Sequence, residues 1–330
     1  MKRFLLSVFS LIIGVILFGV VIGNVGWQGI WDTIILLSGP KWVLIFLLST
    51  AIWFVSSIRF KRILDGMGYS LPVLVLWPTY LAGFAISFLM PMLILGGELF
   101  RAYVIRDRFN IPFQKGAASV LIERLLEMTV LFVIIVFGFL FFFISVGLPS
   151  KELTYIALGA VITVASLLIF FYIRTFKNKS IVRFFSRGTG NGDILELERE
   201  VFRFFTFRNP RFWEGLMWSV IKNLFALARA WLLIMFLGKT ISLLPILSIL
   251  SFFYISMLIP IPAALGIHDA FQAFAFGALG VGASTGAAFA LIIRAVEFLL
   301  AFIGIILVVP LSINFIKNRF LERIGKIIPK

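Results

Sequence analysis

Two arginines stand deep inside apolar stretches of the sequence, and each is followed three residues later by a glutamate. The pairs are Arg124 with Glu127 and Arg294 with Glu297. At this spacing the two side chains share one face of a helix. An unpaired arginine at the centre of a bilayer costs about 2.5–3.5 kcal/mol on insertion scales, so each needs an anionic partner. That partner is either the neighbouring glutamate, in a structural ion pair, or the phosphate of an anionic headgroup, which a guanidinium matches with two parallel hydrogen bonds.

Two glycine-containing segments with a carboxylate follow proline-containing breaks in the apolar pattern. They are Gly96-Gly97-Glu98 and Gly266-Ile267-His268-Asp269. Glycine permits a tight turn and a close approach of the backbone, and a helix that begins there points free N–H groups at a site suited to phosphate. Glu98 and Asp269 are therefore candidates either for capping these helices or for carrying a proton that is coupled to transport.

The other ionisable residues inside apolar stretches have weaker signals. Lys222 lies in the middle of a stretch and is a candidate third cation of the site. Arg59 and Arg229 fall nearer the ends, where long side chains extend to the membrane surface. The single histidine, His268, and the lack of cysteine exclude a multi-histidine metal cluster, a thiolate metal site and a disulfide. No cofactor is expected, and no nucleophile elbow or Walker loop occurs.

The composition places these charges in a membrane protein. Apolar residues make up 61% of the 330 residues and charged residues 14%. A water-soluble fold cannot bury so much apolar surface, so lipid must be the solvent for most of it. We therefore expect an all-α polytopic protein that forms a single transmembrane domain over residues 1–330.

The apolar pattern predicts six full transmembrane helices and two irregular stretches. A bilayer core needs about 20 helical residues. The predicted spans are Phe4–Gly23, Trp42–Ile58, Gly116–Val146, Leu153–Ile173, Trp213–Leu237 and Gly286–Val309. The irregular stretches are Leu71–Leu95, interrupted by Pro78 and Pro91, and Leu243–Ile261, which ends at Pro260-Ile261-Pro262; each continues into a second segment. We expect two broken or re-entrant helical hairpins, which are tolerated only where they are buried or line a cavity.

The distribution of basic residues predicts the topology. With a cytoplasmic N-terminus and hairpins that enter and leave on one side, the cytoplasmic segments hold 23 of the 30 Lys and Arg residues. This positive-inside asymmetry predicts a multi-pass protein of the plasma or inner membrane with both termini cytoplasmic. It also explains the net charge of +15 without a nucleic-acid partner. The linker 174–212 is then cytoplasmic, with an amphipathic helix at Ile194–Phe205 on the membrane surface.

The sequence also contains an internal repeat at an offset of about 170 residues. Gly116–Glu127 matches Gly286–Glu297 at Gly, Arg and Glu, Gly97 matches Gly266, and Arg59 matches Arg229. The repeated units are about 41–146 and about 211–316. In the predicted topology they begin on opposite sides of the membrane, so the repeat is inverted, as in many secondary transporters. We expect Arg124 and Arg294 to reach one shared central cavity.

Three motifs resemble those of a known family. They are Pro91–Arg101 (PMLILGGELFR), Ile122–Glu127 (IERLLE) and Ile259–Asp269 (IPIPAALGIHD), followed by Arg294. In order and spacing they resemble the lysylphosphatidylglycerol synthase transmembrane-region family over nearly the whole chain. The resemblance implies a flippase-like membrane protein, related to modules that occur beside lipid-linked glycosyl transfer. It implies the lipid-flipping half without the soluble aminoacyl-transfer domain.

These observations favour a protein that translocates or binds a lipid with an anionic headgroup, a phospholipid or a polyprenyl-phosphate-linked precursor. One alternative is a non-transporting membrane subunit that assists a lipid-modifying enzyme or glycosyltransferase. A further alternative is an intramembrane enzyme with Glu98, Glu123 or Glu127 as its base, but no convincing nucleophile accompanies them. We therefore expect no enzymatic activity.

Overall fold

Helices are the only regular secondary structure in the described part of the chain, which contains no strand. The computed structural model describes residues 2–90, 96–147, 151–185, 192–259 and 261–327. In chain order the helices are α1 (Lys2–Val25), α2 (Trp27–Ile34), α3 (Gly39–Gly66), α4 (Val73–Leu89), α5 (Gly96–Phe109), α6 (Phe113–Val146), α7 (Lys151–Phe176), α8 (Ile181–Phe185), α9 (Gly192–Phe204), α10 (Pro210–Phe236), α11 (Leu243–Leu258), the 3₁₀ helix η1 (Pro262–Ala264), α12 (Ile267–Ala278) and α13 (Ala283–Ile327). The predicted all-α class is confirmed.

Four helices of the described chain are long and apolar enough to cross a membrane: α3, α6, α10 and the Ala283–Leu311 part of α13. A fifth span results if Val15–Val25 and Trp27–Ile34, which are bent by 88°, count as one. The predicted spans Phe4–Gly23 and Leu153–Ile173 fall within α1 and α7. A total of six full spans therefore stays a prediction.

Each predicted hairpin consists of two helices with a break between them. The first is α4 followed by α5, and the second is α11 followed by η1 and α12. Pro78 lies inside α4, so the predicted interruption there is wrong; a helix in an apolar setting accommodates proline when neighbouring helices support it. The predicted breaks at Pro91 and Pro260 lie outside the described residues.

Local signals explain several helix boundaries. Proline is favoured in the first turn of a helix, where its missing N–H has no intrahelical partner. Pro40 is the second residue of α3, and Pro210 is the first residue of α10. The Asn209 side chain caps α10 by accepting a hydrogen bond from the Arg211 N–H at 3.0 Å. At the C-terminal end of α6, the chain turns at Gly147, whose φ is 90°.

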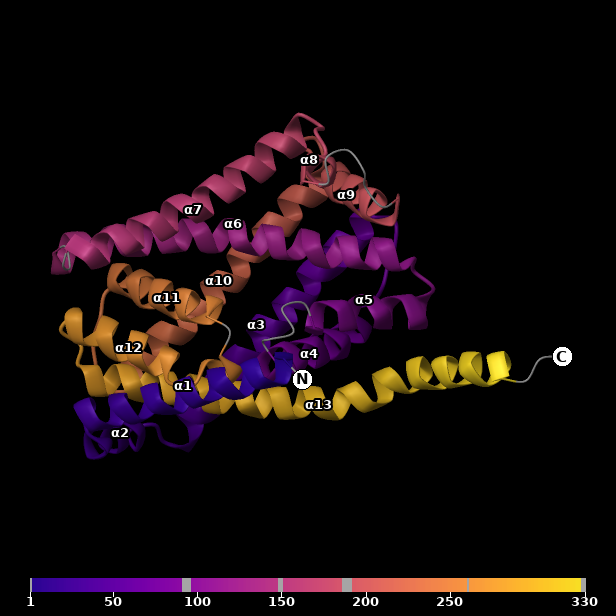
Figure 1. Cartoon of the computed structure of the whole chain (residues 1–330). Coiled ribbons are helices and arrows are strands. Elements are labelled where there is room, and N and C mark those ends of the chain that lie inside the picture. The colour runs from indigo at the N-terminus through magenta and orange to yellow at the C-terminus, as the bar shows by residue number, and fades with distance from the viewer. Residues whose placement is uncertain (1, 91–95, 148–150, 186–191, 260, 328–330) are drawn as a thin grey trace.

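The two units that the sequence repeat predicts pack against each other reciprocally. The first helices of the units, α3 and α10, pack together, α4 of the first packs on α13 of the second, and α11 of the second packs on α6 of the first (Figure 1). Glycines permit two of these close approaches. A Cβ at Gly304 of α13 would lie 2.5 Å from the Leu81 carbonyl, and one at Gly138 of α6 would lie 2.4 Å from the Leu247 carbonyl.

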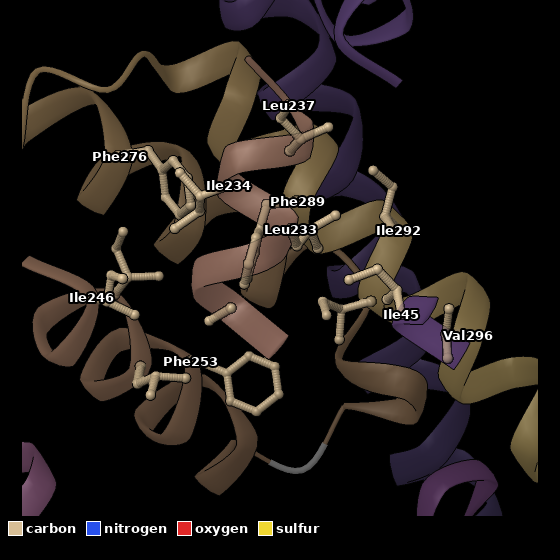
Figure 2. Close-up of a cluster of buried hydrophobic side chains, with 14 of the residues drawn as sticks. Ile45, Leu233, Ile234, Leu237, Ile246, Phe253, Phe276, Phe289, Ile292 and Val296 are labelled. Atoms are coloured by element: carbon tan, nitrogen blue, oxygen red, sulfur yellow. The ribbon is translucent and has the colours of Figure 1, made fainter. Parts of the chain in front are cut away.

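The largest buried apolar cluster lies where the two units meet. Figure 2 shows Ile45 of α3, Leu233 of α10, Ile246 of α11, and Phe289 of α13 within it. Dense packing of such side chains holds the helices at defined positions. The interface between the units is therefore a rigid frame for the polar groups that lie beside it.

The linker contains two helices. The predicted amphipathic helix is present as α9, which packs on α6 and buries Val201 and Phe204. Glu198 of α9 accepts hydrogen bonds from the backbone N–H groups of Ile181 and Val182 at 2.6 and 2.9 Å, and so ties α8 to α9. Neither α8 nor α2 was predicted from the sequence.

Candidate functional site

A cavity of about 90 Å³ lies between the helices of the first unit. It is lined by α3, α4, α5 and α6, together with one residue of α10. The lining residues are Trp53, Arg59, Tyr80, Gly83, Phe84, Ser87, Gly97, Glu98, Arg101, Glu123, Arg124, Glu127 and Lys222. Four of them are cations and three are carboxylates, so the lining carries one positive charge in excess.

Arg59 of α3 lies at the centre of this polar group. It donates hydrogen bonds to Glu123 at 2.9 Å and to Ser219 of α10 at 2.9 Å, and it also pairs with Glu127. Its side chain is buried. The prediction that Arg59 reaches the membrane surface is wrong, because α6 and α10 cover this face of α3 and supply partners for the guanidinium.

Two further residues join Arg59 through Glu123. Arg101 of α5 donates to Glu123 at 2.6 Å, and the Tyr80 hydroxyl of α4 donates to it at 2.7 Å. The Arg101 guanidinium also lies over the Tyr80 and Phe60 rings, at 4.4 and 5.1 Å from their centroids. Cation–π contacts and a shared carboxylate hold this arginine in place. Tyr80 and Arg101 are not among the predicted site residues, because nothing in the sequence around them shows that they contact Glu123 of α6.

Arg124 contacts a different carboxylate from the neighbour that its spacing suggests. It pairs with Glu98 of α5, whereas Glu127 pairs with Arg59 and accepts from Lys222 at 2.6 Å. The predicted alternative of a local Arg124–Glu127 ion pair is therefore wrong. The Arg124 side chain is 48% exposed and that of Glu98 is 6% exposed, so the arginine stands at the edge of the cavity.

The wall beside Glu98 is formed by two backbones in direct contact. A Cβ at Gly97 would lie 2.0 Å from the Gly83 carbonyl oxygen, and one at Gly83 would lie 2.9 Å from the Gly97 carbonyl oxygen. Only glycine permits this approach of α4 and α5. Together with Gly96, which begins α5, the two glycines place the first turn of α5 on the cavity.

The equivalent residues of the second unit form an enclosed group. Arg294 donates to the Asp269 carboxylate at 2.6 Å, with side chains 8% and 0% exposed. Asp269 also accepts from the Gly266 N–H at 2.9 Å, so it caps α12. The predicted alternative of a local Arg294–Glu297 pair is wrong for Arg294, whose salt bridge goes to Asp269. Arg229 donates to Ser49 of α3 at 3.1 Å, and Glu297 is buried nearby on α13.

The cavity contains only part of the predicted site. Arg124, Glu127, Lys222, Gly97 and Glu98 line it. The second-unit set, which comprises Arg294, Glu297, Gly266 and Asp269, is not in its lining. The expectation that both arginines reach one shared cavity is therefore wrong for this arrangement, because the packing of α12 on α13 encloses Arg294 beside Asp269. His268, which precedes Asp269 in α12, is also buried, with Nδ1 3.2 Å from the Ser256 hydroxyl.

Comparison with known proteins finds similarity to membrane proteins. Residues 7–304 match the family described as the lysylphosphatidylglycerol synthase TM region. A UPF0104 membrane protein of Methanocaldococcus jannaschii is 26% identical over 279 residues, which cover 80% of this chain and 82% of that protein. Because the family match covers most of the sequence, this chain belongs to the lysylphosphatidylglycerol synthase TM-region family of membrane proteins.

Proposed function

We propose that this protein is a flippase-like carrier, which binds the anionic headgroup of a membrane lipid in the first-unit cavity and moves it between leaflets. The observation that carries this proposal is the excess positive charge of the cavity lining. An uncompensated charge at membrane depth is costly, so such a cavity favours an anion as its occupant. The family supports a role in lipid handling, since its name is that of the membrane region of a lipid-modifying protein.

The geometry favours phosphate as the anionic group. Arg124 presents a partly exposed guanidinium at the edge of the cavity, and Lys222 lines the same space. A guanidinium matches phosphate with paired hydrogen bonds. The first turn of α5 adds backbone N–H groups and the positive end of a helix dipole. The substrate class is therefore a phospholipid or a polyprenyl-phosphate-linked lipid.

The reciprocal contacts between the units support movement as well as binding. If the units form an inverted repeat, the open site of the first and the enclosed site of the second are two states of one arrangement, and exchanging them exposes Arg294 to the other side of the membrane. Arg294 Nη1 and Asp269 Oδ1 have no hydrogen-bond partner among the described residues, a costly state for buried polar atoms. Such an exchange would give both atoms new partners.

The positive-inside asymmetry supports the rest of the proposal. It favours residence in the plasma or inner membrane with both termini and the linker 174–212 in the cytoplasm. A lipid-modifying enzyme or glycosyltransferase is a reasonable partner, because either acts on the lipids that such a carrier presents. Nucleic acid is not proposed as a partner.

Reconstitution in liposomes tests this proposal. We expect the purified protein to make a fluorescent phosphatidylglycerol in the inner leaflet accessible to an impermeant quencher, and Arg124→Ala and Arg294→Ala to abolish this while remaining folded. Arg62→Ala, which removes a half-exposed cation at the end of α3, is the matched control and should flip normally. Wild-type rates in both Arg124→Ala and Arg294→Ala would remove the headgroup role. Lipid binding without any flipping would instead favour the non-transporting subunit.

A further inference from the structure

The Arg124–Glu98 pair differs from the other ion pairs of the cavity in how firmly its carboxylate is held. Glu123 accepts hydrogen bonds from Arg59, Arg101 and Tyr80. Glu127 pairs with Arg59, accepts from Lys222 at 2.6 Å, and accepts from the Asn223 amide at 3.5 Å. Glu98 pairs with Arg124 and accepts one long hydrogen bond from Ser87 at 3.3 Å. Among the three carboxylates of the cavity, Glu98 is thus the one with the fewest contacts to break.

The position of Glu98 is also favourable for an external anion. It lies in the first turn of α5, where a negative charge is favoured by the helix dipole. Its partner Arg124 is the cavity arginine with a substantially exposed side chain, whereas Arg59 and Arg101 are buried in contacts with Glu123. A phosphate that enters the cavity therefore meets Arg124 first, and meets it already bound to a carboxylate.

The counterpart of this pair in the second unit is held more tightly. Asp269 caps α12 through the Gly266 N–H, and Arg294 makes a second contact at 3.4 Å with the Ala264 carbonyl. Both side chains are buried. Moving Asp269 would uncap a helix as well as break an ion pair, whereas Gly97 and Gly83 keep the α5 backbone in place when Glu98 moves.

We propose that Glu98 occupies the place on Arg124 that the lipid phosphate takes, so that the headgroup binds by displacing the Glu98 carboxylate. Glu98 is then an internal competitor of the substrate. It keeps Arg124 paired while the cavity holds no lipid, and it sets how much affinity a phosphate needs to enter. This inference rests on the proposed function and adds to it the exchange of one anion for another at a named residue.

The competition predicts that removing the Glu98 charge strengthens lipid binding. In Glu98→Gln the amide is a weaker partner for Arg124 than the carboxylate. A hydrogen bond to a charged group contributes about 1.5 kcal/mol or more, which corresponds to about tenfold tighter binding. The measurement is a titration of the purified full-length protein in detergent with dihexanoyl phosphatidylglycerol. Asp65→Asn, which removes a carboxylate paired with Lys61 at the end of α3, is the matched control and should bind like the wild type.

A double variant shows whether the increase in lipid affinity depends on Arg124. Arg124→Ala should bind weakly, and Glu98→Gln combined with Arg124→Ala should bind no more tightly than Arg124→Ala alone. Should Glu98→Gln fail to fold, Glu98→Asp retracts the carboxylate by one methylene and should raise affinity in the same direction by a smaller factor. Inorganic phosphate should show the same rank order at higher concentrations. If Glu98→Gln binds phosphatidylglycerol more tightly than the wild type does but does not bind inorganic phosphate more tightly, the proposed exchange at the phosphate group is overturned.

The outcomes separate this inference from the proposed function. If the wild type binds phosphatidylglycerol but Glu98→Gln binds equally or less tightly, Glu98 is not a competitor and the inference fails alone. If the wild type binds neither phosphatidylglycerol nor inorganic phosphate, the proposed function fails and the inference fails with it.

Discussion

Arg59 and Arg229 each donate a hydrogen bond to a serine on the other arginine's helix. Arg59 of α3 reaches Ser219 of α10 at 2.9 Å, and Arg229 of α10 reaches Ser49 of α3 at 3.1 Å. These two bonds cross the interface between the units in opposite directions. The units differ in what surrounds the arginines, since Arg59 also pairs with Glu123 and Glu127 in a cavity.

Replacing Arg59 should destabilise the protein strongly. In Arg59→Ala the buried Glu123 and Glu127 lose a shared cation, and breaking a buried pair in this way costs about 3–5 kcal/mol. Ser219→Ala, which removes one neutral partner, should cost about 1 kcal/mol. Arg62→Ala on the same helix is partly exposed and should cost less than about 1 kcal/mol. Thermal unfolding in detergent measures all three, and equal effects for Arg59→Ala and Arg62→Ala would contradict the buried network.

Lys222 should control the charge of the cavity. It is the residue that α10 contributes to the lining, and Lys222→Met makes the lining neutral. Without the excess positive charge, we expect phosphatidylglycerol to bind about tenfold more weakly, since a hydrogen bond to a charged group contributes about 1.5 kcal/mol or more. Lys222→Arg keeps the charge and should bind within a few-fold of the wild type. The titration used for Glu98 measures this, and unchanged affinity in Lys222→Met would argue against charge selection.

Two glycines should be intolerant of alanine and one should accept it. A Cβ at Gly97 meets the Gly83 carbonyl at 2.0 Å, and one at Gly286 meets the Gln272 carbonyl at 2.3 Å. Forcing such helices apart costs about 1–3 kcal/mol. Gly159 of α7 has nothing within 4 Å of a Cβ, so Gly159→Ala should leave stability unchanged or raise it, by up to about 1 kcal/mol. Melting temperatures of the three variants provide the comparison, and a harmless Gly97→Ala would refute the close approach.

The proposed topology makes a labelling prediction, which the lack of native cysteine renders simple to test. In intact cells an impermeant maleimide should label Lys239→Cys, which follows α10 on the proposed outer side. It should not label Lys179→Cys in the linker until the membrane is permeabilised. Both positions are exposed in the structure, so access to the thiol depends on the side of the membrane. Labelling of Lys179→Cys in intact cells would reverse the orientation.

The sequence alone was enough to identify an all-helical membrane protein, because in lipid each apolar segment must satisfy its backbone hydrogen bonds locally. The sequence did not determine which charged residues pair with each other. The spacing made Glu127 a candidate partner of Arg124 and predicted that Arg59 extends to the membrane surface. In the structure, Arg124 pairs with Glu98, and Arg59 is buried beside Ser219. These partners lie on other helices, and the packing of α5 on α6 and of α10 on α3 that brings them together depends on side-chain contacts across the whole bundle. Only the assembled fold could therefore decide which cations face the cavity and which are enclosed.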